Sequence, residues 1–176
     1  MKKILVFVLL AGLTLVGLAA QVSTVSHPVT LTVNAIALVG LSDSAGFTLR
    51  VVDPAAAGDD PVGETNNLVY LRYTTVNTTG TSRTITVEWG AAEAAPAGTS
   101  LKVTAGPAGG QGSATAQRTI SNSAQTLITA IPSCATGTGA GSGAQLSYVF
   151  SVDTPASLVA GESQTVNVKY TLTEDS

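Results

Sequence analysis

The sequence holds a single cysteine, Cys134, and a single histidine, His27. One thiol cannot close a disulfide within the chain, and a nucleophile usually needs a histidine beside it as its base. His27 stands next to Pro28 in a polar N-terminal segment, and Cys134 lies in a stretch rich in Gly and Ser. We therefore predict that the chain is not an enzyme and that it uses no cofactor.

Charged residues are scarce and make up 11% of the chain. The basic residues number eight against eleven acidic ones, and two of the eight are Lys2 and Lys3. The others are scattered singly, so they form neither the basic patch that nucleic acid needs nor the cluster that anionic lipid needs. We predict that nucleic acid is not a partner.

Only one long apolar run is present, residues 4–18, and it follows the basic start Met1-Lys2-Lys3. A basic head, a short apolar middle and the small residues that follow are typical of a secretory signal peptide. The run is shorter than the roughly 20 residues that span a membrane, so an uncleaved membrane helix is the weaker alternative. We expect a signal peptide at residues 1–20 and one domain at residues 21–176, without stable membrane insertion after cleavage. The expected location is secreted, extracellular or at the cell surface, with the periplasm as the alternative.

Apolar and polar residues alternate in many short segments, and no stretch keeps a helical period over any length. The alternating segments are residues 29–39, 47–51, 67–76, 83–89, 101–105, 117–131, 146–152 and 166–172. About eight strands separated by turn residues indicate a single antiparallel β-sandwich of Greek-key, immunoglobulin- or pilin-like type. A barrel is the alternative.

Three local features carry more specific expectations. The apolar positions of the first segment change parity between Val33 and Ile36, which predicts a bulge or a crossing between sheets. Residues 67–76 and 83–89, joined by a turn sequence, predict a hairpin with a longer loop. Residues 91–95 could form one helical turn, which is too short to stand as a helix alone.

Acidic residues gather in one loop rich in Pro, Gly and Asp. Carboxylate oxygens are the ligands that Ca²⁺ prefers, so this loop is a weak calcium candidate. It lacks the regular spacing of a calcium loop, and the alternative is a solvated acidic loop without metal. The candidate ligands are Asp53, Asp59, Asp60 and Glu64.

Aromatic residues are few, and two of them could stack on sugar rings. Trp89 and Tyr70 fall on neighbouring predicted strands, and an aromatic face on a β-sheet is typical of carbohydrate-binding modules. Trp89 shares its parity with Ile85 and Val87, which favours the alternative that its ring belongs to the core. Tyr73 has the parity opposite to Tyr70, so these two rings would not share one face.

The segment after the expected leader presents a row of apolar residues. In strand addition, an extended segment with alternating apolar side chains completes the sheet of another subunit. The alternative is an ordinary first strand of the same domain. The candidate assembly strand consists of Val22, Val25, Val29, Leu31 and Val33.

Two stretches carry a family resemblance. Residues 160–173 (A-G-E-S-Q-T-V-N-V-K-Y-T-L-T) resemble the closing strand of secreted bacterial pilin-like and spore-coat-U-like β-sandwich proteins. Residues 121–150, with S-C-A-T-G-T-G followed by Q-L-S-Y, resemble uncharacterised secreted bacterial proteins of similar length. The resemblance implies a structural surface protein. The paired cysteines common in pilin-type domains are absent from this chain.

Taken together, these features predict a secreted structural or adhesive protein of a bacterial surface. Assembly by strand addition would make it a filament or pilus-like subunit, whose partners are further copies or other surface proteins. The alternative is a secreted carbohydrate- or ligand-binding β-sandwich module.

Overall fold

The computed structural model describes residues 24–175 and divides the chain into two compact units, Met1–Thr32 and Val33–Ser176. In the first unit, residues 24–32 form neither helix nor strand, and all of them are exposed. The expected signal peptide and Val22 lie outside the described residues.

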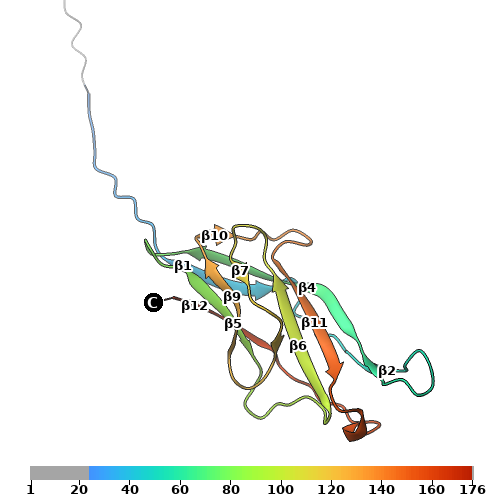
Figure 1. The fold of residues 1–176 in the computed structure, drawn as a ribbon. Coiled ribbons are helices and arrows are strands. Elements are labelled where there is room, and N and C mark those ends of the chain that lie inside the picture. Colours follow the sequence, from blue (N-terminus) through green and yellow to red (C-terminus); the bar gives the residue numbers. More distant parts are fainter. Residues whose placement is uncertain (1–23, 176) are drawn as a thin grey trace, which may run out of the picture. The chain divides into compact units, whose positions relative to one another are not determined.

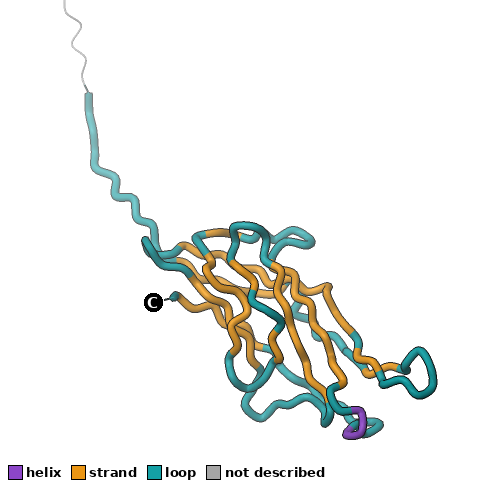
Figure 2. The backbone as a smooth tube through the Cα atoms, viewed as in Figure 1, coloured by secondary structure: helices purple, strands orange, loops and turns teal. Residues whose placement is uncertain are grey.

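The second unit is built from β-strands. Among residues 24–175 there are twelve strands and one short 3₁₀ helix, η1 (Pro155–Ser157), with no α-helix (Figure 2). Every strand pairing is antiparallel, which confirms the predicted all-β class. Seven of these strands have six residues or more, and the other five have two.

The strands form two large sheets and one small one (Figure 1). The six-stranded sheet has the order β1 (Ile36–Leu41), β4 (Thr65–Val76), β11 (Ala144–Val152), β6 (Thr99–Gly106), β8 (Arg118–Thr119), with β10 (Cys134–Ala135) also paired to β4. The four-stranded sheet has the order β12 (Lys169–Glu174), β5 (Arg83–Glu88), β9 (Gln125–Ile131), β7 (Ser113–Ala114).

The small sheet is a hairpin of β2 (Val51–Val52) and β3 (Val62–Gly63), and the predicted acidic loop connects these two strands. Gly63 lies against β11 so closely that a Cβ atom there would stand 1.6 Å from the carbonyl oxygen of Phe150. Only glycine permits such an approach. The hairpin is therefore fixed to the six-stranded sheet through its second strand.

From β4 to β10, each successive strand lies in the other large sheet. The predicted hairpin of residues 67–76 with 83–89 is therefore wrong, because β4 and β5 belong to different sheets. Both strands bury alternate side chains completely or nearly so, such as Leu71 on β4 and Ile85 on β5. The two strands contribute these apolar faces to one shared core instead of pairing along their edges.

One hydrophobic cluster takes side chains from both large sheets. It contains Val69, Leu71, Tyr73, Ile85, Val87, Trp89, Leu101, Val103, Ala105, Ile120, Leu127, Ile128, Ile131, Ala144, Leu146 and Tyr148. The predicted inward positions of residues 83–89, 101–105 and 146–148 are thus confirmed.

The N-terminal part of the fold differs from the expectation. A half-buried strand was predicted from Val29, but β1 begins at Ile36 and the residues before it are exposed. The predicted strand at residues 47–51 is reduced to β2. Residues 91–95 contain a turn at residues 91–92 and no helix. The change of parity between Val33 and Ile36 thus falls just before the first strand, and the register between β1 and β4 has no bulge.

Candidate functional site: an apolar strand edge

The described part of the predicted assembly strand lies open to solvent. The exposed fractions of its side chains are 98% for Val25, 67% for Val29, 89% for Leu31 and 85% for Val33. Single exposed apolar residues are common on protein surfaces, but contiguous ones mark interaction sites. Residues 29–34, V-T-L-T-V-N, are called the donor segment below.

β1 is the first strand of the six-stranded sheet and pairs with β4 on one side. Opposite residues in an antiparallel pair point to the same face of a sheet. Val39 is opposite Tyr73, whose side chain belongs to the core, and so Val39 points toward the core side. Val39 is nevertheless 38% exposed, against 2% for Tyr73. The core side of the sheet is therefore uncovered at this edge.

The hydrogen bonds of β1 show which backbone groups remain available. The N–H of Ser42, the residue after β1, donates to the carbonyl oxygen of Tyr70 on β4 at 2.7 Å. Residues in an antiparallel pair alternate between those that bond to the partner strand and those that point away from it. By this alternation, the backbone N–H and C=O groups of Ala37, Val39 and Leu41 point away from β4.

The four outer strands of the two large sheets differ in how they are protected. Natural edge strands avoid unwanted pairing by being very short or by carrying charges. β7 and β8 have two residues each, and β12 carries Lys169 and Glu174 at its ends. β1 reads I-A-L-V-G-L, with no charge and no proline over six residues. β1 thus lacks both the shortness and the charges found on the other three edges.

The core also reaches the surface beside β12. β1 and β12, which belong to different large sheets, lie next to each other (Figure 1). Along this seam Leu41, Tyr170 and Leu172 pack against the core and remain only partly buried. The two edge strands therefore leave part of the apolar interior accessible to solvent along this seam.

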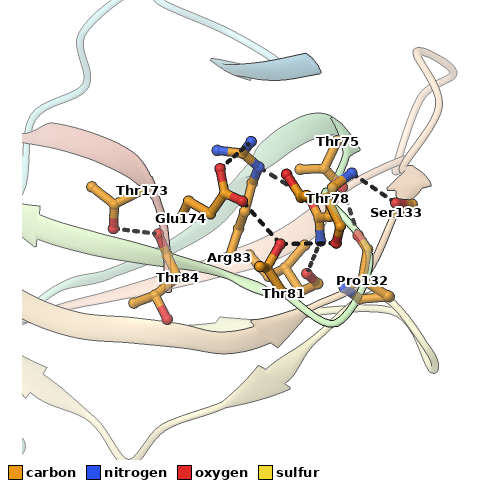
Figure 3. Close-up of polar contacts among 11 residues, drawn as sticks. Thr75, Thr78, Thr81, Arg83, Thr84, Pro132, Ser133, Thr173 and Glu174 are labelled. Atoms are coloured by element: carbon orange, nitrogen blue, oxygen red, sulfur yellow. Dashed lines mark hydrogen bonds and ion pairs between the residues drawn. The ribbon is translucent and has the colours of Figure 1, made fainter. Parts of the chain in front are cut away.

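The end of β12 is held in place by polar contacts (Figure 3). Arg83 is buried, and its Nη2 lies 3.2 Å from Oε2 of Glu174 while its Nε donates to Oδ1 of Asn77 at 3.0 Å. The hydroxyl of Thr81 donates to the other carboxylate oxygen of Glu174 at 2.9 Å. The C-terminal strand is thus fixed to its own sheet.

The structure does not gather the four calcium candidates into one group. Asp53, Asp59 and Asp60 are exposed along the loop between β2 and β3. The carboxylate of Glu64 accepts a hydrogen bond from the backbone N–H of Arg50 at 2.9 Å. Among residues 24–175, no group of three or more His, Cys, Asp or Glu side chains could hold a metal ion.

The two candidate stacking residues lie in different sheets. Trp89 follows β5 and is 9% exposed, whereas Tyr70 lies on β4 and is half-buried. The structure does not bring these rings together on one face. Trp89 does line a hollow of about 350 Å³ together with Gly90, Glu93, Asn167, Val168 and Lys169.

Glu93 is hydrogen-bonded to a second residue that lines this hollow. Its carboxylate accepts hydrogen bonds from the side chain of Asn167 at 2.7 Å and from the backbone N–H of the same residue. These bonds, the side-chain bond first, lower the pKa of Glu93. They join Asn167, just before β12, to the segment that follows β5.

Sequence reasoning singled out the apolar row of residues 29–33, which is exposed in the structure, but did not single out β1 as an edge strand. The signal for it was visible in the uncharged run of residues 36–41. A comparison with models of known protein families finds no match, and neither do searches of curated proteins and of solved structures. Among residues 24–175 no helix is long and apolar enough to cross a membrane.

Proposed function

We propose that the chain is a secreted structural or adhesive protein of a bacterial surface that assembles with further copies by strand addition. In this proposal the two large sheets form one Greek-key β-sandwich, and residues 1–20 direct export and are removed. The resemblance of residues 160–173 to pilin-like sandwich proteins supports the same function.

The observation that carries the proposal is the exposed apolar row of the donor segment. Val29, Leu31 and Val33 alternate with polar residues, so an extended chain presents all three on one side. Burying an exposed Val or Leu side chain stabilises a complex by about 1.5–3 kcal/mol. Three such side chains supply enough free energy to offset much of the cost of ordering the segment.

Assembly can be measured on the exported protein. Analytical ultracentrifugation over a range of concentrations and negative-stain electron microscopy should show oligomers or filaments. Leu31→Asp should abolish them, because it places a charge in the apolar row. Thr32→Asp is the matched control, since it adds the same charge on the polar side of the same segment. A protein that stays monomeric at every concentration contradicts the proposal.

Export can be tested separately. N-terminal sequencing of the mature protein should show that the chain begins close to Gln21, and cell fractionation should place it outside the cytoplasm. Retention of Met1 in a cytoplasmic protein would contradict this part of the proposal.

Carbohydrate binding is a second candidate function, favoured by the hollow beside Trp89. Its lining combines an aromatic residue, Trp89, with the charged residues Glu93 and Lys169, which is the mixture of apolar and polar contacts that sugars need. A glycan array with the intact protein tests it. Lys169→Ala should weaken a positive signal without unfolding the domain, whereas a blank array rejects this candidate.

A further inference from the structure

We infer that the solvent-facing side of the six-stranded sheet carries a binding site for one acidic sugar residue, whose carboxylate is held by Arg72. This site is separate from the hollow beside Trp89, which follows a strand of the other large sheet. The inference goes beyond the proposed function, because it requires no assembly.

The register between β1 and β4 leaves an open space beside Arg72. Val39 is opposite Tyr73, whose side chain belongs to the core, so the next pair, Gly40 and Arg72, faces solvent. Gly40 has no side chain, and a Cβ atom there would meet no atom within 4 Å. The cross-strand partner of Arg72 therefore does not fill the space next to the arginine.

This space belongs to a hollow of about 380 Å³. The hollow is lined by residues of β1, β4 and β10 and by residues 136–138, which follow β10, and both Gly40 and Arg72 take part in the lining. Its volume lies near the lower end of the range for ligand pockets. The hollow therefore suits one small ligand.

The guanidinium group of Arg72 is held in position by the loop after β10. Its Nη2 donates to the carbonyl oxygen of Gly139 at 3.0 Å, and its Nε donates to that of Ser142 at 3.4 Å. Within residues 24–175 the N–H groups of Nη1 have no acceptor, and every carboxylate that forms an ion pair does so with a different cation. The positive charge of Arg72 is thus fixed in place but is not balanced by a carboxylate of the described residues.

A fixed guanidinium group beside an open hollow is suited to an incoming carboxylate. The two groups bind through parallel, charge-assisted hydrogen bonds. Among the described residues, Arg72 is the one charged residue that lines this hollow. The chain as a whole carries more acidic than basic residues, which disfavours a polyanion. The ligand therefore carries one carboxylate instead of a row of anionic groups.

The other lining residues favour a sugar as the body of this ligand. Thr74 and Thr138 offer hydroxyl groups, which can both donate to and accept from the hydroxyls of a sugar. Leu38 is 64% exposed and supplies an apolar contact for the C–H groups of a sugar ring.

An acidic peptide is a poorer fit to the same hollow. An extended peptide binds by pairing its backbone with a strand edge. The hollow lies on the face of the sheet over β4, which is already paired with β1 on one side and with β10 and β11 on the other. A peptide there would find no row of backbone groups to pair with.

NMR spectra of the intact, isotope-labelled exported protein test this site. The probes are glucuronic acid, its uncharged counterpart glucose, acetate, and a short peptide that contains aspartate. Glucuronic acid should shift the amide signals of Gly40, Arg72, Thr74 and Thr138 in a saturable way. Glucose should need a concentration at least about tenfold higher, because it lacks the charge-assisted hydrogen bonds.

Two variants remove the site in different ways. Gly40→Leu fills the hollow and leaves the hydrogen bonds of Arg72 intact, whereas Arg72→Gln removes the charge. Each should weaken the binding of glucuronic acid by at least about tenfold, with the circular dichroism spectrum unchanged. Gly46→Leu is the matched control for the first variant. A side chain at Gly46 also meets no atom within 4 Å, and Gly46 does not line the hollow, so this variant should bind like the wild type.

Four outcomes would overturn the inference. Absence of any shift with glucuronic acid rejects the site, and equal affinity for glucose shows that Arg72 does not recognise the carboxylate. Acetate that binds as tightly as glucuronic acid shows that the sugar ring contributes nothing. Tighter binding of the aspartate peptide makes the partner a protein. None of these measurements depends on assembly, so the proposed function is tested independently.

Discussion

The phenolic oxygens of Tyr148 and Tyr170 are hydrogen-bonded to each other, which joins β11 of one large sheet to β12 of the other. The ring of Tyr148 is buried in the core, and Phe47 packs against it with the ring centroids 5.0 Å apart. Burial in apolar surroundings raises the pKa of Tyr148 and of Tyr170. The pair is therefore a polar contact within the apolar interior, next to the seam beside β1.

The two hydroxyl groups should contribute to the free energy of unfolding as a coupled pair. Tyr148→Phe or Tyr170→Phe leaves the remaining hydroxyl without its partner, so each should lower the free energy of unfolding by about 1–3 kcal/mol. The double variant removes both polar groups and should cost less than the sum of the single changes. Urea unfolding of the four proteins measures this coupling. Purely additive costs would show that the pair contributes nothing as a unit.

Alkaline pH should destabilise the domain through its buried tyrosines. Burial raises the pKa of Tyr73 to about 12, and its hydroxyl donates to the carbonyl oxygen of Gln111 at 2.6 Å. Above about pH 10 the unfolded chain releases phenolic protons that the folded chain keeps, so the free energy of unfolding falls as pH rises.

This effect can be measured by urea unfolding between pH 9 and pH 12 (~3 pH units, spanning the ordinary tyrosine pKa). Tyr73→Phe should make the decline shallower by at most about 1.4 kcal/mol per pH unit. The loss of stability that Tyr73→Phe causes at neutral pH is subtracted before the two slopes are compared. An unchanged slope would mean that Tyr73 ionises equally easily in both states.

The ion pair at the C-terminal end joins a buried Arg83 to an exposed Glu174, so removing the acid should cost more than removing both charges. Glu174→Ala leaves the Arg83 guanidinium buried without its counter-charge, and should cost about 2–4 kcal/mol. Adding Arg83→Met should recover part of that loss, because it removes the unpaired charge. Lys102→Met tests a more exposed pair, with Asp153 at 3.3 Å, and should cost less than about 1 kcal/mol. Thermal unfolding separates these cases, and equal losses for both pairs would contradict the asymmetry.

Replacing Ala130 by glycine should stabilise the domain. It has a φ of 51°, a left-handed conformation that costs a residue with a Cβ atom about 1–2 kcal/mol. Ala130→Gly should raise the free energy of unfolding by up to about 1 kcal/mol. Ala144→Gly, at a fully buried position of β11, should lower it by about 1–2 kcal/mol. Ala130 lies in β9 where its pairing with β5 shifts register, and a loss of stability in Ala130→Gly would show that this irregularity does not strain the alanine.

The longer strands could be predicted because alternation reports which side of a strand is apolar. The positions predicted to face inward on β5, β6 and the first part of β11 are buried, including Val87, Val103 and Leu146. Alternation does not report which strand lies beside which, and the hairpin of β4 with β5 was wrong for that reason. Strands of two residues have too few positions to alternate, so β7 lay outside the predicted strands and β8 was merged with β9 into one predicted segment, residues 117–131.

The donor segment also shows that alternation does not report what covers an apolar face. Val29, Leu31 and Val33 have the pattern of a half-buried strand, yet all three are exposed. An apolar face indicates that something covers it, and the pattern is the same whether the cover is the same chain or another copy. The edge position of β1 is a property of pairing, which a single strand sequence does not contain.

The repeated crossing of the chain between the large sheets also governs how the domain folds. β5 pairs with β9 and with β12, so the four-stranded sheet gains one of its longer strands only from residues 169–174. Contacts between distant segments slow folding, because long loops must close before any contact is gained. An N-terminal fragment cannot complete this sheet, and a growing chain would reach its native state only after its last few residues are available. Until then the donor segment, near the start of the chain, has been synthesised while the domain that follows it is still incomplete.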